Sequence, residues 1–191
     1  MQKKVDDFLK IVEPPDAERR TKGKLLQQRA VDEQWMGLAL QRGEEARRQG
    51  EVPVGAVVVL KDGFLTAAGN SAIGLADPSA HAEMLAIRAA AKLLGNYRLP
   101  EATLYSTFEP CIMCMGALIQ ARISRLVFGV ANSKRGAAIS VYNIGNYQRL
   151  NHTVAVTGGI LAEACAQLLC NFYKKPRGVF NVINSPFLKI N

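Results

Sequence analysis

Two short motifs contain residues of the types and spacing that bind a catalytic metal. His81 and Glu83 stand two positions apart, and Cys111 and Cys114 form a CxxC that follows Pro110. In a helix, two cysteines three positions apart present both sulfur atoms on one side. One imidazole and two thiolates are ligands that Zn²⁺ favours, and three protein ligands leave its fourth position open for water. The pattern predicts a catalytic zinc site held by His81, Cys111 and Cys114.

Glu83 has the position of a proton carrier rather than of a ligand. Zinc lowers the pKa of a bound water to about 7. A carboxylate beside that water can take its proton and later protonate a leaving amine. The combination HxE…PCxxC is the signature of the zinc-dependent nucleobase deaminases. We therefore expect hydrolytic deamination, with Glu83 as the catalytic acid and base.

A CxxC pair alone is more often a redox pair or half of a structural zinc site. A redox pair needs no histidine, and a structural site needs a fourth ligand, whereas the second histidine, His152, lies in a distant turn-rich stretch. A structural site also has no use for the Glu83 carboxylate. Cys165 and Cys170 are five positions apart on a predicted helix, so they are expected to be packed or exposed thiols rather than ligands.

Composition limits the partners. The chain has 191 residues, 49% of them apolar, which suits one domain with a modest extension. A net charge of +8 favours an anionic partner such as nucleic acid, with ordinary surface charge as the alternative. No run of 18 or more apolar residues and no signal-peptide pattern are present, so we expect no membrane contact and a cytoplasmic location.

The elements that must position these motifs alternate between helices and buried strands. Helices are predicted at residues 31–49, 80–94, 110–122 and 160–173, and strands at 54–60, 64–69, 103–108, 126–130 and 154–157. Residues 61–63 (Lys-Asp-Gly) are a hairpin signal, which makes the first two strands antiparallel. His81 and Cys111 fall at helix starts, whose positive field stabilises thiolates. The order predicts a three-layer α/β domain.

The domain boundaries are expected near both ends. We assign residues 1–30 to an N-terminal extension and linker, because Pro14-Pro15 cannot lie inside a regular helix and charged residues follow. Residues 31–175 are the predicted deaminase domain. Residues 176–191 are a predicted C-terminal tail, since Pro176 ends the last helix.

Longer stretches extend the comparison beyond the metal site. The runs EVPVGAVVV, DPSAHAEMLAIR, EPCIMCMGALI and NHTVAVTGGILAEACAQLL resemble the bacterial tRNA-specific adenosine deaminases (TadA) over residues 31–175. The resemblance implies the cytidine-deaminase fold with a central mixed sheet, one zinc ion per chain, and a homodimer. It also implies conversion of adenosine to inosine in a tRNA anticodon loop. By the same resemblance Asn70 contacts the base, with a hydrogen bond to the backbone of its own loop as the alternative. Val54 is then an apolar wall of the substrate pocket.

A further set of residues departs from the natural pattern. Natural members carry Asp and Thr where this chain has Asn132 and Arg135, changes that favour a phosphate backbone nearby. Tyr147, Tyr173 and Phe180 offer rings for stacking or for packing. The complete set is Phe108, Asn132, Arg135, Asn143, Asn146, Tyr147, Cys170, Tyr173, Pro176, Val179, Phe180, Asn181, Ile190 and Asn191.

This set resembles the laboratory-evolved deaminase of adenine base editors, which acts on deoxyadenosine in single-stranded DNA. We therefore expect an engineered origin and that substrate. Two alternatives stay open, a natural-type activity on tRNA only and a variant directed at cytosine. Ser106, on the strand before the CxxC, either tunes substrate choice or packs.

Overall fold

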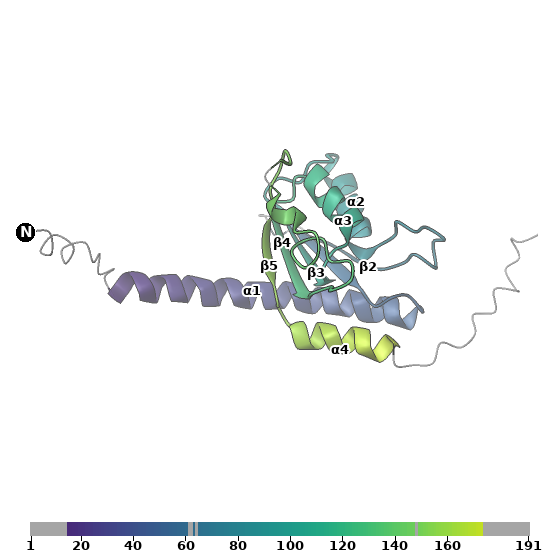
Figure 1. Cartoon of the computed structure of the whole chain (residues 1–191), viewed down its shortest axis with the longest axis horizontal. Helices are drawn as coiled ribbons and strands as arrows, with labels where there is room; N and C mark the ends of the chain where they lie inside the picture. Colours follow the sequence, from purple (N-terminus) through teal and green to yellow (C-terminus); the bar gives the residue numbers. More distant parts are fainter. Residues whose placement is uncertain (1–14, 61–62, 64, 148, 174–191) are drawn as a thin grey trace, which may run out of the picture.

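The sheet at the centre of the molecule has five strands in the order β2-β1-β3-β4-β5 (Figure 1). The computed structural model describes residues 15–60, 63, 65–147 and 149–173. β1 (Gly55–Val59) pairs antiparallel with β2 (Leu65–Gly69) and with β3 (Thr103–Phe108). β4 (Arg125–Val130) runs parallel to β3 and to β5 (Ala155–Gly158). The sheet is therefore mixed, as expected.

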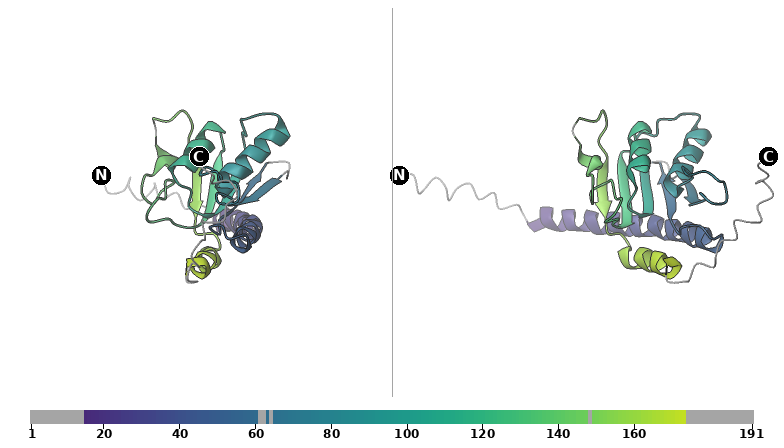
Figure 2. Two further views of the ribbon diagram at one scale, coloured as in Figure 1. Left: turned by 90° about the vertical axis from the view of Figure 1, so that its right-hand side faces the viewer. Right: turned by 45° about the vertical axis from the view of Figure 1, so that its right-hand side comes forward.

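Helices cover both faces of this sheet. α2 (Ala82–Leu94) and α3 (Ile112–Gln120) lie on one face, and α1 (Pro15–Arg48) and α4 (Ala162–Tyr173) lie on the other (Figures 1 and 2). A short helix, η3 (Ile144–Asn146), interrupts the long loop after β4. The fold is the three-layer α/β arrangement that the sequence predicts. None of the helices among the described residues is apolar enough over a sufficient length to cross a bilayer.

Side chains that alternate along the strands build two cores. Leu104 and Leu126 pack with α2 and α3, whereas their neighbours Tyr105 and Val127 pack with α1 and α4. This alternation is the period of two that a strand imposes on its side chains. Consecutive residues of β3 therefore serve opposite faces of the sheet.

The long helix α1 begins earlier than predicted. The sequence analysis started this helix at residue 31, but it starts at Pro15. Proline is well suited to the first position of a helix, where its missing N–H is not needed and its φ is already helical. The prediction was wrong because it treated Pro14-Pro15 as a break only. Residues 1–14 of the predicted extension and the predicted tail at residues 176–191 lie outside the described residues.

A buried ion pair fixes the second half of α1 to the sheet. Both carboxylate oxygens of Asp32 accept hydrogen bonds from Arg125 of β4, each at 2.7 Å. The Tyr105 hydroxyl of β3 donates to the same carboxylate at 3.0 Å, and Gln28 donates at 3.1 Å. Burial alone would raise the pKa of Asp32, but these donors outweigh it and hold the pKa below its ordinary value.

Candidate active site

The metal-binding motifs occupy the starts of two neighbouring helices. His81 is the N-cap residue of α2 and Cys111 is the N-cap residue of α3, both with extended backbones. Cys114 lies in the first turn of α3 and is fully buried. Because α2 and α3 cover the same face of the sheet, their first turns bring the two motifs together, as the sequence predicts.

The three side chains have the spacing of zinc ligands. His81 Nδ1 lies 3.7 Å from Cys111 Sγ and 3.5 Å from Cys114 Sγ, and the two sulfur atoms are 3.7 Å apart. A tetrahedral zinc ion with usual bond lengths requires about 3.8 Å between two sulfurs and about 3.5 Å between sulfur and nitrogen. Within the described residues no other group of three such side chains is as close together. The donor set and its geometry fit Zn²⁺.

Glu83 lies beside this group in the first turn of α2. Its side chain is buried, with 4% of the residue exposed. Burial raises the pKa of Glu83, and the neighbouring His81 ring opposes that effect. The Ser106 hydroxyl shares its one hydrogen between the Phe108 carbonyl oxygen, at 2.8 Å, and the Glu83 carboxylate, at the longer distance of 3.4 Å. The carboxylate thus stands next to the ligands without being needed as one of them.

A cleft of about 920 Å³ opens over His81, Glu83 and Cys111. Its size is that of a small-molecule site. Most of the residues that the sequence analysis assigned to substrate binding line it. These are Val54, Asn70, Asn132, Arg135 and Tyr173. Val52, Ala72, Phe108, Glu109, Ile112, Lys134, Tyr142 and Leu169 complete the lining.

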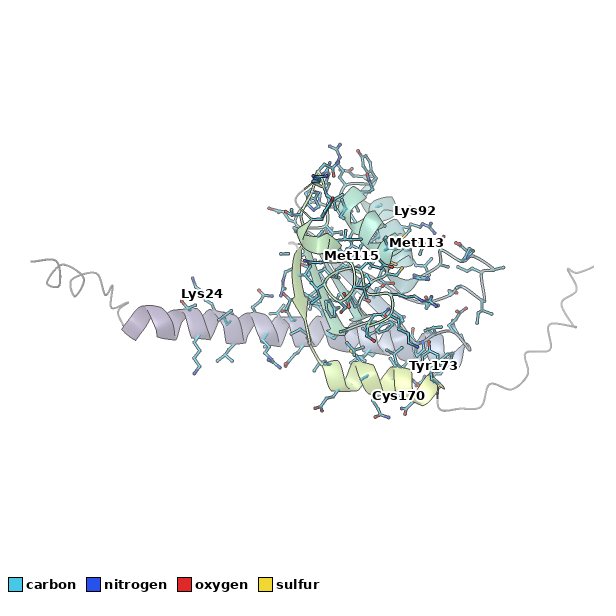
Figure 3. All side chains as sticks on the ribbon, viewed as in Figure 1. Lys24, Lys92, Met113, Met115, Cys170 and Tyr173 are labelled. Carbon is cyan, nitrogen blue, oxygen red and sulfur yellow. The ribbon has the colours of Figure 1, made fainter. Side chains whose placement is uncertain are left out.

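Of the predicted substrate-binding residues that the structure describes, one is not brought to this cleft. Tyr147 follows η3 and is exposed outside the cleft lining. Phe180 lies outside the described residues. Tyr173, in contrast, is at the end of α4 and lies at the cleft, 58% exposed (Figure 3). Cys165 is buried and Cys170 is exposed, so neither joins the metal group.

One wall of the cleft is held by a buried carboxylate that the sequence analysis gave no role. Glu51 accepts hydrogen bonds from the backbone N–H groups of Ile73 and Gly74, at 2.8 and 2.7 Å. It also accepts one from the side-chain amide of Asn70, at 3.3 Å. Among the described residues Asn70 makes no other side-chain hydrogen bond, so its carbonyl oxygen and second N–H are available to a ligand.

The opposite wall is held in the same way. Glu109, 1% exposed, accepts hydrogen bonds from the backbone N–H groups of Asn132, Ile139 and Ser140, at 2.8–2.9 Å. A side chain at Gly136 would collide with the Glu109 carboxylate, so only glycine fits there. The only feature of the sequence that could have indicated this role of Glu109 is its position, as an acidic residue at the junction between a buried strand and the CxxC helix.

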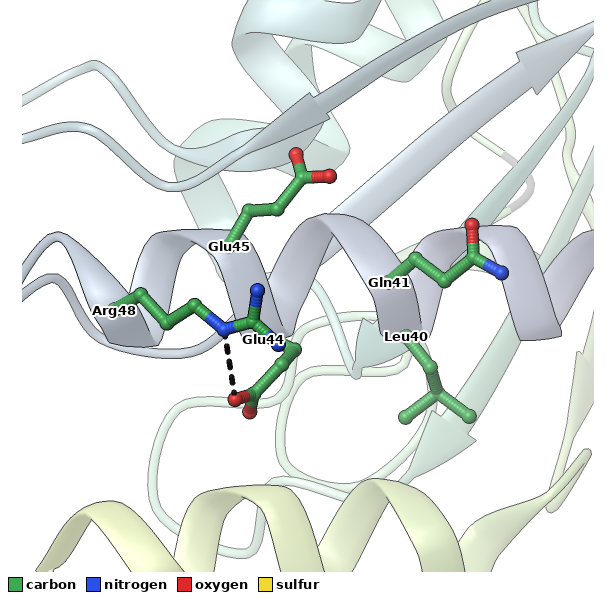
Figure 4. A pocket seen from close by; sticks show the side chains of 5 residues that line it. All are labelled: Leu40, Gln41, Glu44, Glu45 and Arg48. Carbon is green, nitrogen blue, oxygen red and sulfur yellow. Dashed lines mark hydrogen bonds and ion pairs between the residues drawn. The ribbon is translucent and has the colours of Figure 1, made fainter.

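A second hollow lies on α1, away from the metal group. It measures about 450 Å³ and is lined by Leu40, Gln41, Glu44, Glu45 and Arg48 (Figure 4). Arg48 pairs with Glu44 at 3.4 Å, and Glu45 pairs with Arg42 at 2.7 Å. Its charges are therefore matched within the helix, and no reactive group faces it.

Known proteins share both the sequence and the fold. Residues 29–130 match the family described as the cytidine and deoxycytidylate deaminase zinc-binding region. The tRNA-specific adenosine deaminase of Haemophilus influenzae is 46% identical over 76% of this chain and 85% of its own length. That of Bacillus subtilis is 40% identical over 76% of this chain and 91% of its own length.

Solved structures of deaminases are also similar to this chain. A tRNA:A34 deaminase that edits A to I at the wobble position superimposes with a TM-score of 0.69 at 41% identity. The alignment covers 71% of this chain and 99% of that one. A guanine deaminase from Nitrosomonas europaea superimposes with a TM-score of 0.61 at 26% identity, over 73% and 83% of the two chains. The chain belongs to the zinc-binding cytidine and deoxycytidylate deaminase family and, within it, to the tRNA-specific adenosine deaminases.

Proposed function

We propose that this chain hydrolytically deaminates adenine in a nucleic acid strand, and that its working substrate is deoxyadenosine in single-stranded DNA. The observation that carries the proposal is that one cleft joins the metal group and Glu83 to Asn132 and Arg135. A reactive centre for an exocyclic amine and a surface for a phosphate backbone are thus continuous.

The reaction adds water to the carbon that carries the amine and releases ammonia, which leaves a carbonyl in place of the amine. Zinc held by His81, Cys111 and Cys114 would lower the pKa of a bound water to near neutral and so supply the nucleophile. Glu83 accepts a proton from the attacking water and delivers it to the departing nitrogen. Burial of Glu83 keeps bulk water away from this transfer.

The choice of adenine follows from the relatives and from Asn70. Two relatives, 46% and 40% identical to this chain, are named as tRNA-specific adenosine deaminases, and a structural relative is named as a deaminase of guanine, another purine. Asn70 lies in the cleft with an amide oxygen and an N–H available, which can pair with the edge of a purine taken out of the stack. Val54 supplies an apolar wall beside it.

The proposal of DNA as the substrate rests on the wall of the cleft whose loop is held by Glu109. Asn132 accepts hydrogen bonds from the backbone N–H groups of Lys134 and Arg135, at 3.2 and 3.0 Å. An aspartate would accept the same two bonds, so Asn132 changes the charge of the cleft and not the shape of its wall. Removing an anion and adding the Arg135 cation both favour a strand of phosphates. The resemblance to the evolved base-editor deaminase supports the same substrate and an engineered origin.

A homodimer is part of the proposal, as the resemblance implies. Ile112, at the start of the apolar helix α3, is 57% exposed, and Leu93 and Leu94 at the end of α2 are also exposed. Sedimentation equilibrium tests this proposal. A mass of twice 20.8 kDa is expected, and a monomer at micromolar concentration contradicts it.

The substrate is tested with matched strands. Single-stranded DNA and an anticodon stem-loop RNA, each containing A and C, are incubated with the zinc-loaded protein, and the products are read by mass. Conversion of deoxyadenosine in DNA is expected. Products from RNA only would assign a natural-type tRNA activity and contradict the DNA proposal. Products from cytosine would contradict the assignment of adenine.

The variant Asn132→Asp isolates the contribution of charge. We expect about a tenfold loss of kcat/KM on DNA, the effect of restoring one anion near the phosphates, with the larger part in KM and at low salt. Asn132→Ser is the matched control, because it keeps a short acceptor for the turn without a charge. Equal activity of the Asp variant and the parent on DNA would overturn the role of Asn132.

A further inference from the structure

We propose that Tyr142 is the stacking platform for the nucleobase next to the target adenine. This inference rests on the proposed function, since it requires a single strand in the cleft. Tyr142 belongs neither to the metal group nor to the residues that the sequence analysis singled out.

Tyr142 has the exposure of a ligand-facing ring. It lines the cleft and is 56% exposed. Among the described residues its ring makes no aromatic or cation–ring contact. In contrast, the Tyr173 ring packs against Phe172, and the Arg98 guanidinium lies over the Tyr97 ring. Tyr142 therefore presents an aromatic surface at the cleft that the fold itself does not use.

The backbone that carries Tyr142 is held in place by the Glu109 carboxylate. Glu109 accepts hydrogen bonds from the backbone N–H groups of Ile139 and Ser140, three and two positions before Tyr142. The N–H of Val141 donates to the Gly136 carbonyl oxygen at 3.0 Å. A ring on such a fixed loop loses little conformational entropy when a base stacks on it, which is the advantage of a preorganised contact.

The chemistry of the target explains why such a platform is useful. A base must leave the stack to reach a buried carboxylate such as Glu83, and this movement removes a stacking partner from its neighbour. The neighbour stays at the cleft mouth, where Tyr142 can replace the lost partner. Lys134 and Arg135 line the same wall and are exposed, so they can hold the phosphates on either side.

An abasic substitution tests this contact separately from the reaction. Three DNA strands share one target adenine. The first is intact, the second lacks the base on the 5′ side, and the third lacks the base on the 3′ side. Tyr142→Ala is expected to lower kcat/KM on the intact strand by about tenfold, the usual effect of losing one base–aromatic stack. On one of the two abasic strands, Tyr142→Ala and the parent should be equal, because the contact is already absent.

Two further variants make the test specific. Tyr142→Phe keeps the ring and should retain the parent's preference between the intact and abasic strands. Tyr97→Ala removes a similarly exposed ring that does not line the cleft and should leave all three rates unchanged. Thermal unfolding of each variant confirms that the fold is retained.

The outcomes separate this inference from the proposed function. If the parent converts no adenine in any DNA strand, the proposed function fails. If the parent is active and Tyr142→Ala loses nothing on the intact strand, Tyr142 is not a stacking platform. An equal loss on all three strands also overturns the inference, since it would show a role unrelated to a neighbouring base.

Discussion

Two adjacent residues of β3 contact two buried carboxylates on opposite faces of the sheet. The Ser106 hydroxyl donates to Glu83 on the α2 face, and the Tyr105 hydroxyl donates to Asp32 on the α1 face. Both carboxylates come from helices, and both are almost fully buried. Their surroundings differ in one respect, because Arg125 pairs with Asp32 through two hydrogen bonds and no arginine or lysine contacts Glu83 among the described residues.

This difference distinguishes the structural carboxylate of Asp32 from the carboxylate of Glu83, for which we propose a catalytic role. The donors around Asp32 hold its pKa below the ordinary value, so it stays ionised and fixed. Burial raises the pKa of Glu83, so its protonated form is closer in free energy to the ionised one. We infer that the same strand supports stability on one face and, through the role proposed for Glu83, proton transfer on the other. Each prediction below changes one side of this comparison.

The largest effect is expected from Glu83→Gln. This variant keeps the size of the side chain but cannot carry a proton, so kcat should fall by about 10² to 10⁴. Bound zinc, measured by atomic absorption, and the unfolding temperature should stay close to those of the parent. Loss of zinc together with loss of activity would show that Glu83 acts as a ligand and would contradict its assigned role.

On the opposite face, Asp32→Asn should act on stability instead. Removing one partner of a buried ion pair leaves Arg125 unmatched, which costs about 3 kcal/mol. Urea unfolding measures this loss, and the kcat of the folded variant should remain within about twofold of the parent, because the site is on the other face. A large loss of kcat without loss of stability would erase the distinction between the two carboxylates.

The same pair predicts a dependence of stability on pH. Because the folded-state pKa of Asp32 lies below its unfolded value, its contribution is complete above the ordinary range of aspartate. The contribution is lost as the pH falls through the folded-state pKa. The difference in unfolding free energy between parent and Asp32→Asn should therefore be constant from pH 7 to pH 5 and shrink towards pH 3. A difference that grows on acidification would reverse the assigned sign.

The smallest effect is expected from Ser106→Ala. The hydroxyl lies 3.4 Å from the Glu83 carboxylate, which is a long hydrogen bond, and its shorter bond is to the Phe108 carbonyl oxygen. We expect a threefold to tenfold fall in kcat, roughly the value of one modest hydrogen bond, with KM unchanged. Ser106→Thr restores a hydroxyl and should recover part of the rate. A change confined to KM would assign Ser106 to substrate binding rather than to positioning Glu83.

The metal group could be predicted from sequence because its signal is local. His81, Cys111 and Cys114 are set by spacing within two short motifs, and helix starts bring such motifs together in this fold. The strands were predicted to within about two residues because buried strands leave continuous apolar runs.

The cleft walls were harder to predict because long-range contacts set them. Glu51 and Glu109 each hold a loop through backbone N–H groups more than twenty residues away, and neither bond leaves a pattern in the sequence. For the same reason, the sequence could not distinguish Tyr142, which lines the cleft, from Tyr147, which does not. The start of α1 was missed because proline can either end or open a helix.

α1 joins an exposed segment and a packed segment in one continuous helix. Residues 21–31 are exposed, and Asp32 is the first buried residue after them. The helical stretch before Asp32 is about 25 Å long at 1.5 Å per residue, and a helix of that length is marginal without packing. Its amides should exchange with deuterium by local opening, whereas those near Met36 and Ala39 should exchange only when the whole domain opens.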